Sequence, residues 1–270
     1  MKCTARMLGV AFVCLIGASA CGNIDDEYDP GVEEFEAQEQ PLDEYLSWRG
    51  HTIGRWDTVQ EQFNDDIKMA SSPGGRSGQA IRFRVTPKSK PIDQGRPRER
   101  AEVARAKLEK PGTAAEYTWS TYFPSNFKPA KNTTHNTFTQ FHHVPFTSGG
   151  VASGQANVSF LIDSRPGYGK ERIKVVVRGG NINNPQIKTF DLGRLRRGKW
   201  YDFSFRVKWS ATNNGFFRVR VNGQPKVKWH NRKTLYSGNP GVKLKQGFYR
   251  HHSNFNTVIY HDNMKRWSLR

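Results

Sequence analysis

The chain has 270 residues, of which 36% are hydrophobic, so it is long enough for one large domain with its own core. Seventeen Phe and seven Trp favour sheets packed by large rings over a helical bundle. The formal charge is +18, and all three cysteines precede residue 22, which excludes disulfides and cysteine-based metal or nucleophile chemistry from everything that follows.

The first 21 residues have the features of a secretion signal. Lys2 and Arg6 give a positive start, and the apolar run 8–16 is far shorter than the roughly 20 residues that a membrane-spanning helix needs. Small residues then lead to Cys21, an arrangement that resembles a bacterial lipobox, in which the cysteine is lipidated. The alternative is an ordinary cleaved signal with an incidental cysteine. We therefore expect an exported protein of the bacterial cell envelope, lipid-anchored at Cys21, or a secreted one.

The charge is divided unevenly along the chain. Residues 22–47 hold ten acidic residues and no Lys or Arg, which predicts a disordered tether. Residues 48–270 keep 40 of the 42 basic and 14 of the 24 acidic residues, a formal charge of +26. A domain so basic should bind a polyanion, which could be nucleic acid, anionic lipid or an acidic polysaccharide.

From Trp48 onward the recurring pattern is alternation of apolar and basic residues. It is clearest in residues 81–85, 201–209 and 217–221, and it predicts half-buried strands. Asn214-Gly215 and Asn222-Gly223 stand between such runs and predict hairpin turns.

About a dozen short strands without crossover helices predict an antiparallel two-sheet sandwich or jelly roll, as one domain over 48–270. The only helical pattern we expect is a short amphipathic turn within 58–68.

The first stretch that suggests chemistry runs from Arg98 to Val103. Arg100 and Glu102 are two residues apart and would share one strand face with Arg98, while Ala101 and Val103 face the core. An Arg held beside a Glu is fixed in orientation and can present its fork to a carboxylate. A plain surface salt bridge is the alternative.

The second stretch is residues 138–142, in which Gln140 and His142 project from the same face of a strand. An amide beside an imidazole suits a polar cleft, and the alternative is a histidine packed at the edge of the core. His143 would point to the opposite face and receives no role.

The third stretch alternates Lys245, Gly247 and Tyr249 on one face and turns Leu244 and Phe248 inward. The glycine leaves a gap in which a sugar ring could lie close to the backbone. Positive charge from the flanking lysines should favour the phenolate of Tyr249. The alternative is a tyrosine stacked on an exposed sheet.

In this order, Arg-x-Glu, Gln-x-His and Lys-x-Gly-x-Tyr resemble the motifs of the jelly-roll polysaccharide lyases, which include alginate lyases, glucuronan lyases and heparin lyase I-like enzymes. The resemblance covers about residues 50–270. Two departures favour the glucuronan and heparin branches over the alginate branch. Ala101 replaces a usual hydroxyl or small polar residue, and residues 242–244 lack the Tyr-Phe pair of the alginate lyases.

The resemblance implies an all-β fold, a concanavalin A-like β-jelly-roll sandwich of two antiparallel sheets with a basic concave groove. It also implies β-elimination on a uronate polysaccharide, which leaves unsaturated uronate ends. Arg100 and Gln140 would neutralise the substrate carboxylate, with His142 sharing that role or acting as base. Tyr249 would move protons, either as both base and acid or as acid opposite His142. We expect Gln140 and His142 to form the middle row of this three-strand site.

The remaining expectations concern substrate, cofactor and rivals. The residues expected to bind substrate are Arg98, Glu102, Lys174, Arg178 and Lys245, with Arg218 and Arg220 as further subsites. Ligand spacing does not predict a metal, although Ca²⁺ held by loop oxygens, as in some relatives, is left open. We expect a monomer with an anionic polysaccharide as partner, touching the membrane only through its lipid.

The sequence leaves three alternatives to the lyase function to consider. A non-catalytic, lectin-like polysaccharide-binding protein would keep the basic face without needing Tyr249. A glycoside hydrolase needs two carboxylates across the scissile bond, and the 14 acids of 48–270 are scattered. Binding of nucleic acid is not expected, because the chain looks exported and shows no known nucleic-acid motif.

Overall fold

The computed structural model of the chain describes residues 56–61, 66–87, 89, 98–144, 155–167 and 170–269. All of these belong to the unit Glu36–Arg270, and the unit Met1–Phe35 lies outside them. The expected signal, acidic tether and lipid-carrying Cys21 therefore fall outside the described residues. Over the ranges that are described, no helix has the length and apolar character needed to cross a membrane.

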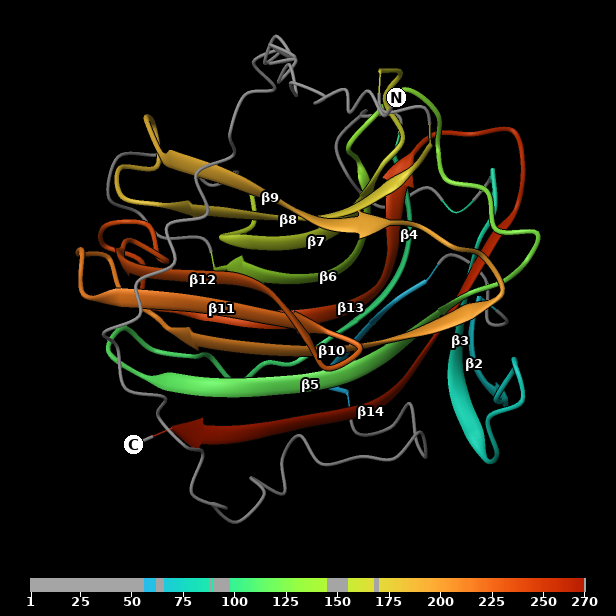
Figure 1. Cartoon of the computed structure of the whole chain (residues 1–270), viewed down its shortest axis with the longest axis horizontal. Helices are drawn as coiled ribbons and strands as arrows, with labels where there is room; N and C mark the ends of the chain where they lie inside the picture. Colours follow the sequence, from blue (N-terminus) through green and yellow to red (C-terminus); the bar gives the residue numbers. More distant parts are fainter. Residues whose placement is uncertain are drawn as a thin grey trace, which may run out of the picture. The chain divides into compact units, whose positions relative to one another are not determined.

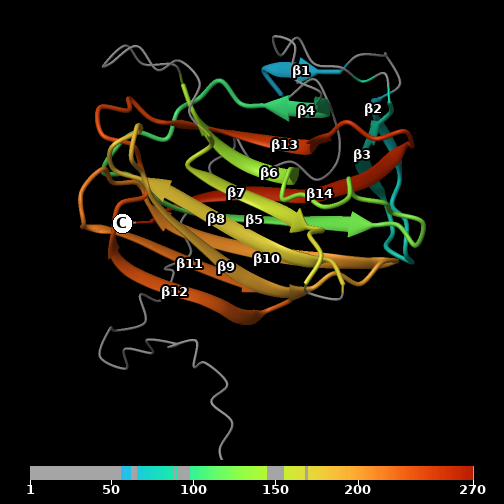
Figure 2. The same ribbon diagram turned by 90° about the horizontal axis from the view of Figure 1, so that it is seen from above.

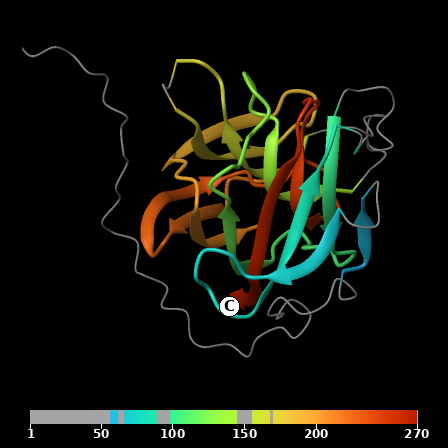
Figure 3. The same ribbon diagram turned by 90° about the vertical axis from the view of Figure 1, so that its right-hand side faces the viewer.

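In the described part of the chain, fourteen strands form two antiparallel sheets of seven strands each, which confirms the predicted sandwich (Figures 1 and 2). In order across the first sheet lie β1 (Thr58–Gln60), β4 (Arg98–Ala104), β13 (Val242–His251), β6 (Asn136–His143), β7 (Val158–Asp163), β8 (Arg172–Gly179) and β9 (Gln186–Arg194). In order across the second lie β12 (Gln224–Arg232), β11 (Gly215–Val221), β10 (Lys199–Lys208), β5 (Ala114–Phe123), β14 (Thr257–Leu269), β3 (Gln79–Val85) and β2 (Ile67–Ser71). Figure 3 shows β14 in dark red beside β3 in cyan.

The core lies between the two sheets and is built largely from aromatic rings, as the composition predicts. Trp119 of β5 stacks on Phe203 of β10, with ring centroids 5.1 Å apart. The same indole meets Phe160 of β7, in the other sheet, edge to face at 5.0 Å. Rings packed in this way bury large apolar areas and add a pairwise attraction of about 0.5–1.5 kcal/mol each. Aromatic contacts therefore hold the two layers together.

Both predicted hairpins are confirmed. Residues 222 and 223 join β11 to β12, and Asn222 (φ 51°) and Gly223 (φ 76°) both have the positive φ that a two-residue type I′ turn requires. The other hairpin joins β10 to β11, which begins at Gly215.

The helical turn expected within 58–68 is wrong at the described residues of that range, and residues 62–65 lie outside them. Residues 58–60 form β1 and pair with residues 102–104 of β4, and Ile67 begins β2. A few apolar residues at helical spacing cannot nucleate a helix when the same backbone groups can pair with a neighbouring strand.

His261 of β14 makes the stability of the fold depend on pH. Its Nδ1 lies 3.0 Å from Thr121 Oγ1, and burial lowers its pKa from 6.5 to about 4. Because the unfolded chain takes up this proton first, the contribution to stability is complete above about pH 6.5 and is lost as the pH falls toward about 4. We expect the melting temperature to fall across this window, and to fall less steeply in His261→Gln. Parallel slopes of melting temperature against pH in the two proteins would contradict this assignment.

Candidate active site

The three predicted stretches lie on adjacent strands of the first sheet. Tyr249 of β13 is directly opposite Arg100 of β4 on one side, and on the other side Lys245 is opposite Gln140 of β6. Residues directly opposite one another in an antiparallel pair project from the same face. The middle strand is β13, so the expectation that Gln140 and His142 form the middle row is wrong: they flank β13 from β6.

One row of opposite residues crosses most of this face. It passes from Arg100 through Tyr249, Thr137 and Leu161 to Lys174 of β8. Two cations therefore stand on the same face as the Tyr249 hydroxyl, one beside it and one three strands away. We call this outward face of the first sheet the active face. Whether it is hollowed into a groove stays a prediction.

Glu102 gathers the polar side chains at the centre of the active face. Its Oε1 accepts a hydrogen bond of 2.5 Å from Gln140 Nε2, and its Oε2 lies 3.0 Å from Lys245 Nζ and 3.7 Å from Arg100 Nη1. Burial alone would raise the pKa of Glu102, but the charges of Lys245 and Arg100 and the hydrogen bonds outweigh it and hold the pKa below 4.5. The buried carboxylate therefore stays ionised and fixes three donors in place.

Gly247 makes this arrangement possible. It lies opposite Glu102, between Lys245 and Tyr249, where the register of β13 against β6 shifts. Its φ is 140°, and a Cβ there would stand 2.1 Å from the carbonyl oxygen of Ala101. Glycine therefore allows the close approach of β13 to the backbone of β4, and Gln140 of β6 reaches Glu102 of β4 across this intervening strand. The expectation that a sugar ring lies close to the backbone at this glycine stays a prediction.

Tyr249 is surrounded by arginines. Arg98 Nη1 donates a hydrogen bond of 2.8 Å to its hydroxyl oxygen, and the Arg100 guanidinium carbon lies 4.4 Å from the ring centroid. The sequence predicted lysines in this role, but Lys245 pairs with Glu102 instead. The reason is distance: Lys245 is four residues, or roughly 13 Å of strand, from Tyr249, whereas Arg100 is directly opposite.

His142 lies at the other end of the cluster, opposite Lys243. Its Nδ1 donates a hydrogen bond of 2.7 Å to the carbonyl oxygen of His143, and burial lowers its pKa to about 4. The imidazole is therefore neutral near pH 7, with Nε2 as an acceptor. Tyr249 is opposite Thr137, which precedes His142 by five residues on β6. The backbone positions of Tyr249 and His142 are therefore separated by roughly 16 Å along the strand.

The two basic residues expected on β8 are both held by protein groups. Lys174 is buried and its Nζ lies 2.9 Å from Asp163 Oδ2, while Arg178 donates from Nη1 to the carbonyl oxygen of Ala156 at 3.0 Å. Hydrogen bonds from Arg165 and Lys174 outweigh burial and lower the pKa of Asp163 to about 2. The sequence does not identify Asp163 as a site residue, because a single Asp after an apolar run is typical of the end of a strand.

Two histidines beside Arg98 were also missed. His251 is opposite Arg98, and its ring lies 4.5 Å from that of His135. Burial and the nearby charge of Arg98 lower the pKa of His135 to about 4. The signal for His251 was present in the sequence, since it continues the alternation of Gly247 and Tyr249 by one more step.

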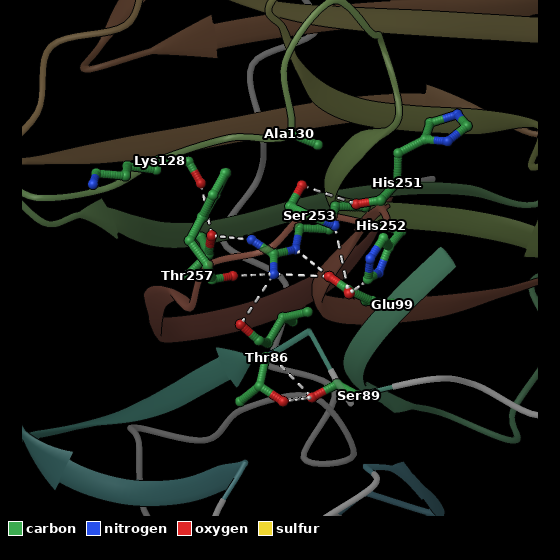
Figure 4. Close-up of polar contacts among 12 residues, drawn as sticks. Thr86, Ser89, Glu99, Lys128, Ala130, His251, His252, Ser253 and Thr257 are labelled. Atoms are coloured by element: carbon green, nitrogen blue, oxygen red, sulfur yellow. Dashed lines mark hydrogen bonds and ion pairs between the residues drawn. The ribbon is translucent and has the colours of Figure 1, made fainter. Parts of the chain in front are cut away.

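Behind Tyr249 the strands are joined by a buried ion pair (Figure 4). Arg250 is fully buried and its Nε donates to Glu99 Oε2 at 2.8 Å, while Glu99 Oε1 lies 2.7 Å from His252 Nδ1. Arg250 also donates to the side chain of Thr257 and, at 2.5 Å, to a backbone carbonyl of the following loop. Figure 4 shows the ring of His251 pointing away from this cluster. The ion pair thus ties β4 to β13 on the face opposite Tyr249.

Arg218 and Arg220, expected as further subsites, do not belong to the active face. Both lie on β11 of the second sheet and alternate with the buried residues Phe217, Val219 and Val221, so they face outward on the other side of the sandwich. Sequence alternation shows which residues share a face of one strand, but it does not show to which sheet the strand belongs.

Within the described ranges, no group of three or more His, Cys, Asp or Glu residues is placed to hold a metal ion. Ca²⁺ binding stays an open expectation.

Several solved structures to which this chain is similar are polysaccharide lyases. The chain is similar to the endo-β-1,4-glucuronan lyase of the fungus Trichoderma reesei, at 16% identity and a TM-score of 0.68, over 83% of this chain and 94% of that one. It is also similar to alginate lyase AlyC3, at 14% identity and a TM-score of 0.52, over 71% and 75% of the two chains. The marine PL-14 alginate lyase of Aplysia kurodai matches at 14% identity and a TM-score of 0.50, over 83% and 98%. These likenesses confirm the jelly-roll fold.

Two comparisons at the level of sequence give different results for this chain. No curated protein sequence matches it significantly. The family model described as polysaccharide lyase matches residues 49–265, which include every strand of the two sheets except the last four residues of β14. This decides between the enzyme and the purely lectin-like alternative. The chain belongs to the polysaccharide lyase family.

Proposed function

We propose that this lyase cleaves a 4-linked polyuronate by β-elimination on the active face. The observation that carries the proposal is the setting of Tyr249, whose hydroxyl oxygen accepts from Arg98 while Arg100 lies against its ring. The C5 proton of a uronate is barely acidic, because its removal adds a second negative charge beside the carboxylate. Donors held in place before the reaction are the means of stabilising that charge.

Arg100 and Gln140 are the donors that we assign to the substrate carboxylate. Both contact Glu102, which holds their side chains in place, and its single negative charge leaves one net positive charge when it is shared between Arg100 and Lys245. Arg100 on β4 and Gln140 on β6 flank β13 on its two sides and can meet one carboxylate lying over Gly247. Glu102 is then a positioning residue rather than a group that reacts.

Tyr249 is the group that we assign to proton transfer. A guanidinium that donates to the phenol oxygen stabilises negative charge that develops on it during proton transfer. The separation of roughly 16 Å along β6 between the positions of Tyr249 and His142 supports Tyr249 as both base and acid. After taking the C5 proton, Tyr249 returns it to the O4 leaving group, so the C5–H and C4–O4 bonds break and the C4=C5 double bond forms.

Glucuronan is the first substrate we propose, and alginate is the second. The glucuronan lyase is the more similar of the two classes of structure, with a TM-score of 0.68 against 0.52 for AlyC3. The residues of this chain point the same way, since residues 242–244 lack the Tyr-Phe pair of the alginate lyases.

A product screen tests the proposal. The purified protein is incubated with glucuronan, alginate, heparin and hyaluronan, each with Ca²⁺ and with a chelator, and the ultraviolet absorbance of unsaturated uronate is followed. We expect product from glucuronan first. A wild-type protein that releases no unsaturated product from any of the four polymers would show that the proposal is wrong.

A further inference from the structure

The outer face of the second sheet carries a concentrated group of cations. Arg206 of β10 is directly opposite Arg218 of β11, and Arg218 is directly opposite Lys228 of β12. Like charges directly opposite one another in a sheet are destabilising. Arg218 and Lys228 thus stand directly opposite each other as like charges at the centre of this outer face.

The group extends beyond this row, and we call it the basic outer patch. Its members all point away from the core on β10, β11, β12 and β14, and they are Arg206, Lys208, Arg218, Arg220, Lys228 and Lys265. Within these rows one carboxylate lies among the cations: Glu116 of β5 is opposite Arg206, accepts from its Nε at 2.8 Å and accepts from Ser204 Oγ at 2.7 Å. Six cations against this carboxylate leave the patch positive, and Asp202 and Asp262, both opposite Ser120, border it one row further along.

An aromatic ring lies at one end of the patch. Phe216 is half-buried, opposite Lys208, and the guanidinium carbon of Arg218 lies 5.9 Å from its ring centroid. A half-buried ring beside cations offers a sugar both an apolar contact and a partner for its carboxylate. Neighbouring strands are about 4.8 Å apart, which is comparable with the length of one hexopyranose unit.

We infer that the basic outer patch is a second, non-catalytic binding site for an anionic polysaccharide. It lies on the opposite side of the sandwich from the active face, because each is the outward face of a different sheet. The occupant is a polymer of the class that the active face cleaves, so the inference rests on the proposed substrate class but not on the chemistry of Tyr249. A site on the far side can hold the enzyme on a long chain or on a polymer network while the active face engages another segment.

Binding is measured with the full chain carrying Tyr249→Phe, so that the polymer is not cleaved. Arg218, Arg220 and Lys228 are changed to Ala together, and the matched control changes Lys131, Lys170 and Lys199, three exposed lysines outside the patch, to Ala. Both variants lose the same charge. In affinity electrophoresis through gels containing glucuronan or alginate, we expect the patch variant to bind roughly fivefold more weakly and the control to match its parent.

A second measurement uses the active enzyme with Tyr249 intact. The patch variant should lose several-fold in kcat/KM on the polymer and keep its kcat/KM on a uronate tetrasaccharide. Equal retardation of patch and control variants would overturn the inference, and so would a patch that retards nucleic acid but not polyuronate. Failure of the proposed function is a separate result, since it means that the wild type releases no unsaturated product at all.

Discussion

Changing Tyr249 to Phe should abolish measurable release of unsaturated uronate while the protein still binds the polysaccharide. The substitution removes the one oxygen that we assign to proton transfer and leaves the ring under the Arg100 guanidinium. Loss of a general acid-base group costs about 10²–10⁴-fold in rate. Because Tyr249 serves both proton steps in the proposed mechanism, we expect the loss at the upper end. Initial rates by ultraviolet absorbance, together with affinity electrophoresis, measure both parts of this prediction.

Two matched variants make the result specific. Tyr260→Phe removes the same oxygen from β14, on the outer face of the second sheet, and should keep wild-type activity. His142→Gln keeps a polar side chain at a position roughly 16 Å of strand away from Tyr249 and should lose far less activity than Tyr249→Phe. If His142→Gln loses as much as Tyr249→Phe, the imidazole is the base and the two-residue mechanism replaces the one we propose.

The sequence predicts the features of this site that depend only on the alternation of residues along one strand. Alternation correctly put Arg100 and Glu102 on one face and Leu244 and Phe248 in the core. It could not predict that β13 lies between β4 and β6, because strand order depends on pairing between segments more than a hundred residues apart. The choice of lysine over arginine as the neighbour of Tyr249 failed for the same reason.

The buried ion pair behind Tyr249 shows a second limit of sequence reasoning. Glu99 stands between Arg98 and Arg100, and an uninterrupted polar run reads as a surface segment. In the structure Glu99 and its partner Arg250 are fully buried. Alternation identifies the inward-facing positions of a strand by their apolar residues. A charged residue at an inward position, such as Glu99, is therefore assigned to the surface. Only the partner, on a strand that is distant in the sequence, makes such burial tolerable.

Breaking that pair should be the most destabilising single change near the site. Arg250→Met leaves Glu99 buried without its cation, a situation that costs about 3–5 kcal/mol. For a domain of this size we expect the melting temperature to fall by roughly 10 °C. Differential scanning calorimetry measures the fall, and Arg76→Ala is the control. Arg76 pairs with Asp202 at 3.0 Å on the surface, where the Asp202 side chain is 59% exposed, and exposed pairs contribute little.

The double variant Glu99→Leu with Arg250→Met separates two explanations of that loss. If the single variant is unstable because a charge is buried alone, removing both charges should restore much of the lost stability, since apolar pairs often replace buried ion pairs at little cost. Restored stability without restored activity would show that the pair also sets the register that brings Arg98 and Arg100 to Tyr249. A double variant that is no more stable than Arg250→Met would instead show that the bonds from Arg250 to Thr257 and the loop after β13 carry the stability.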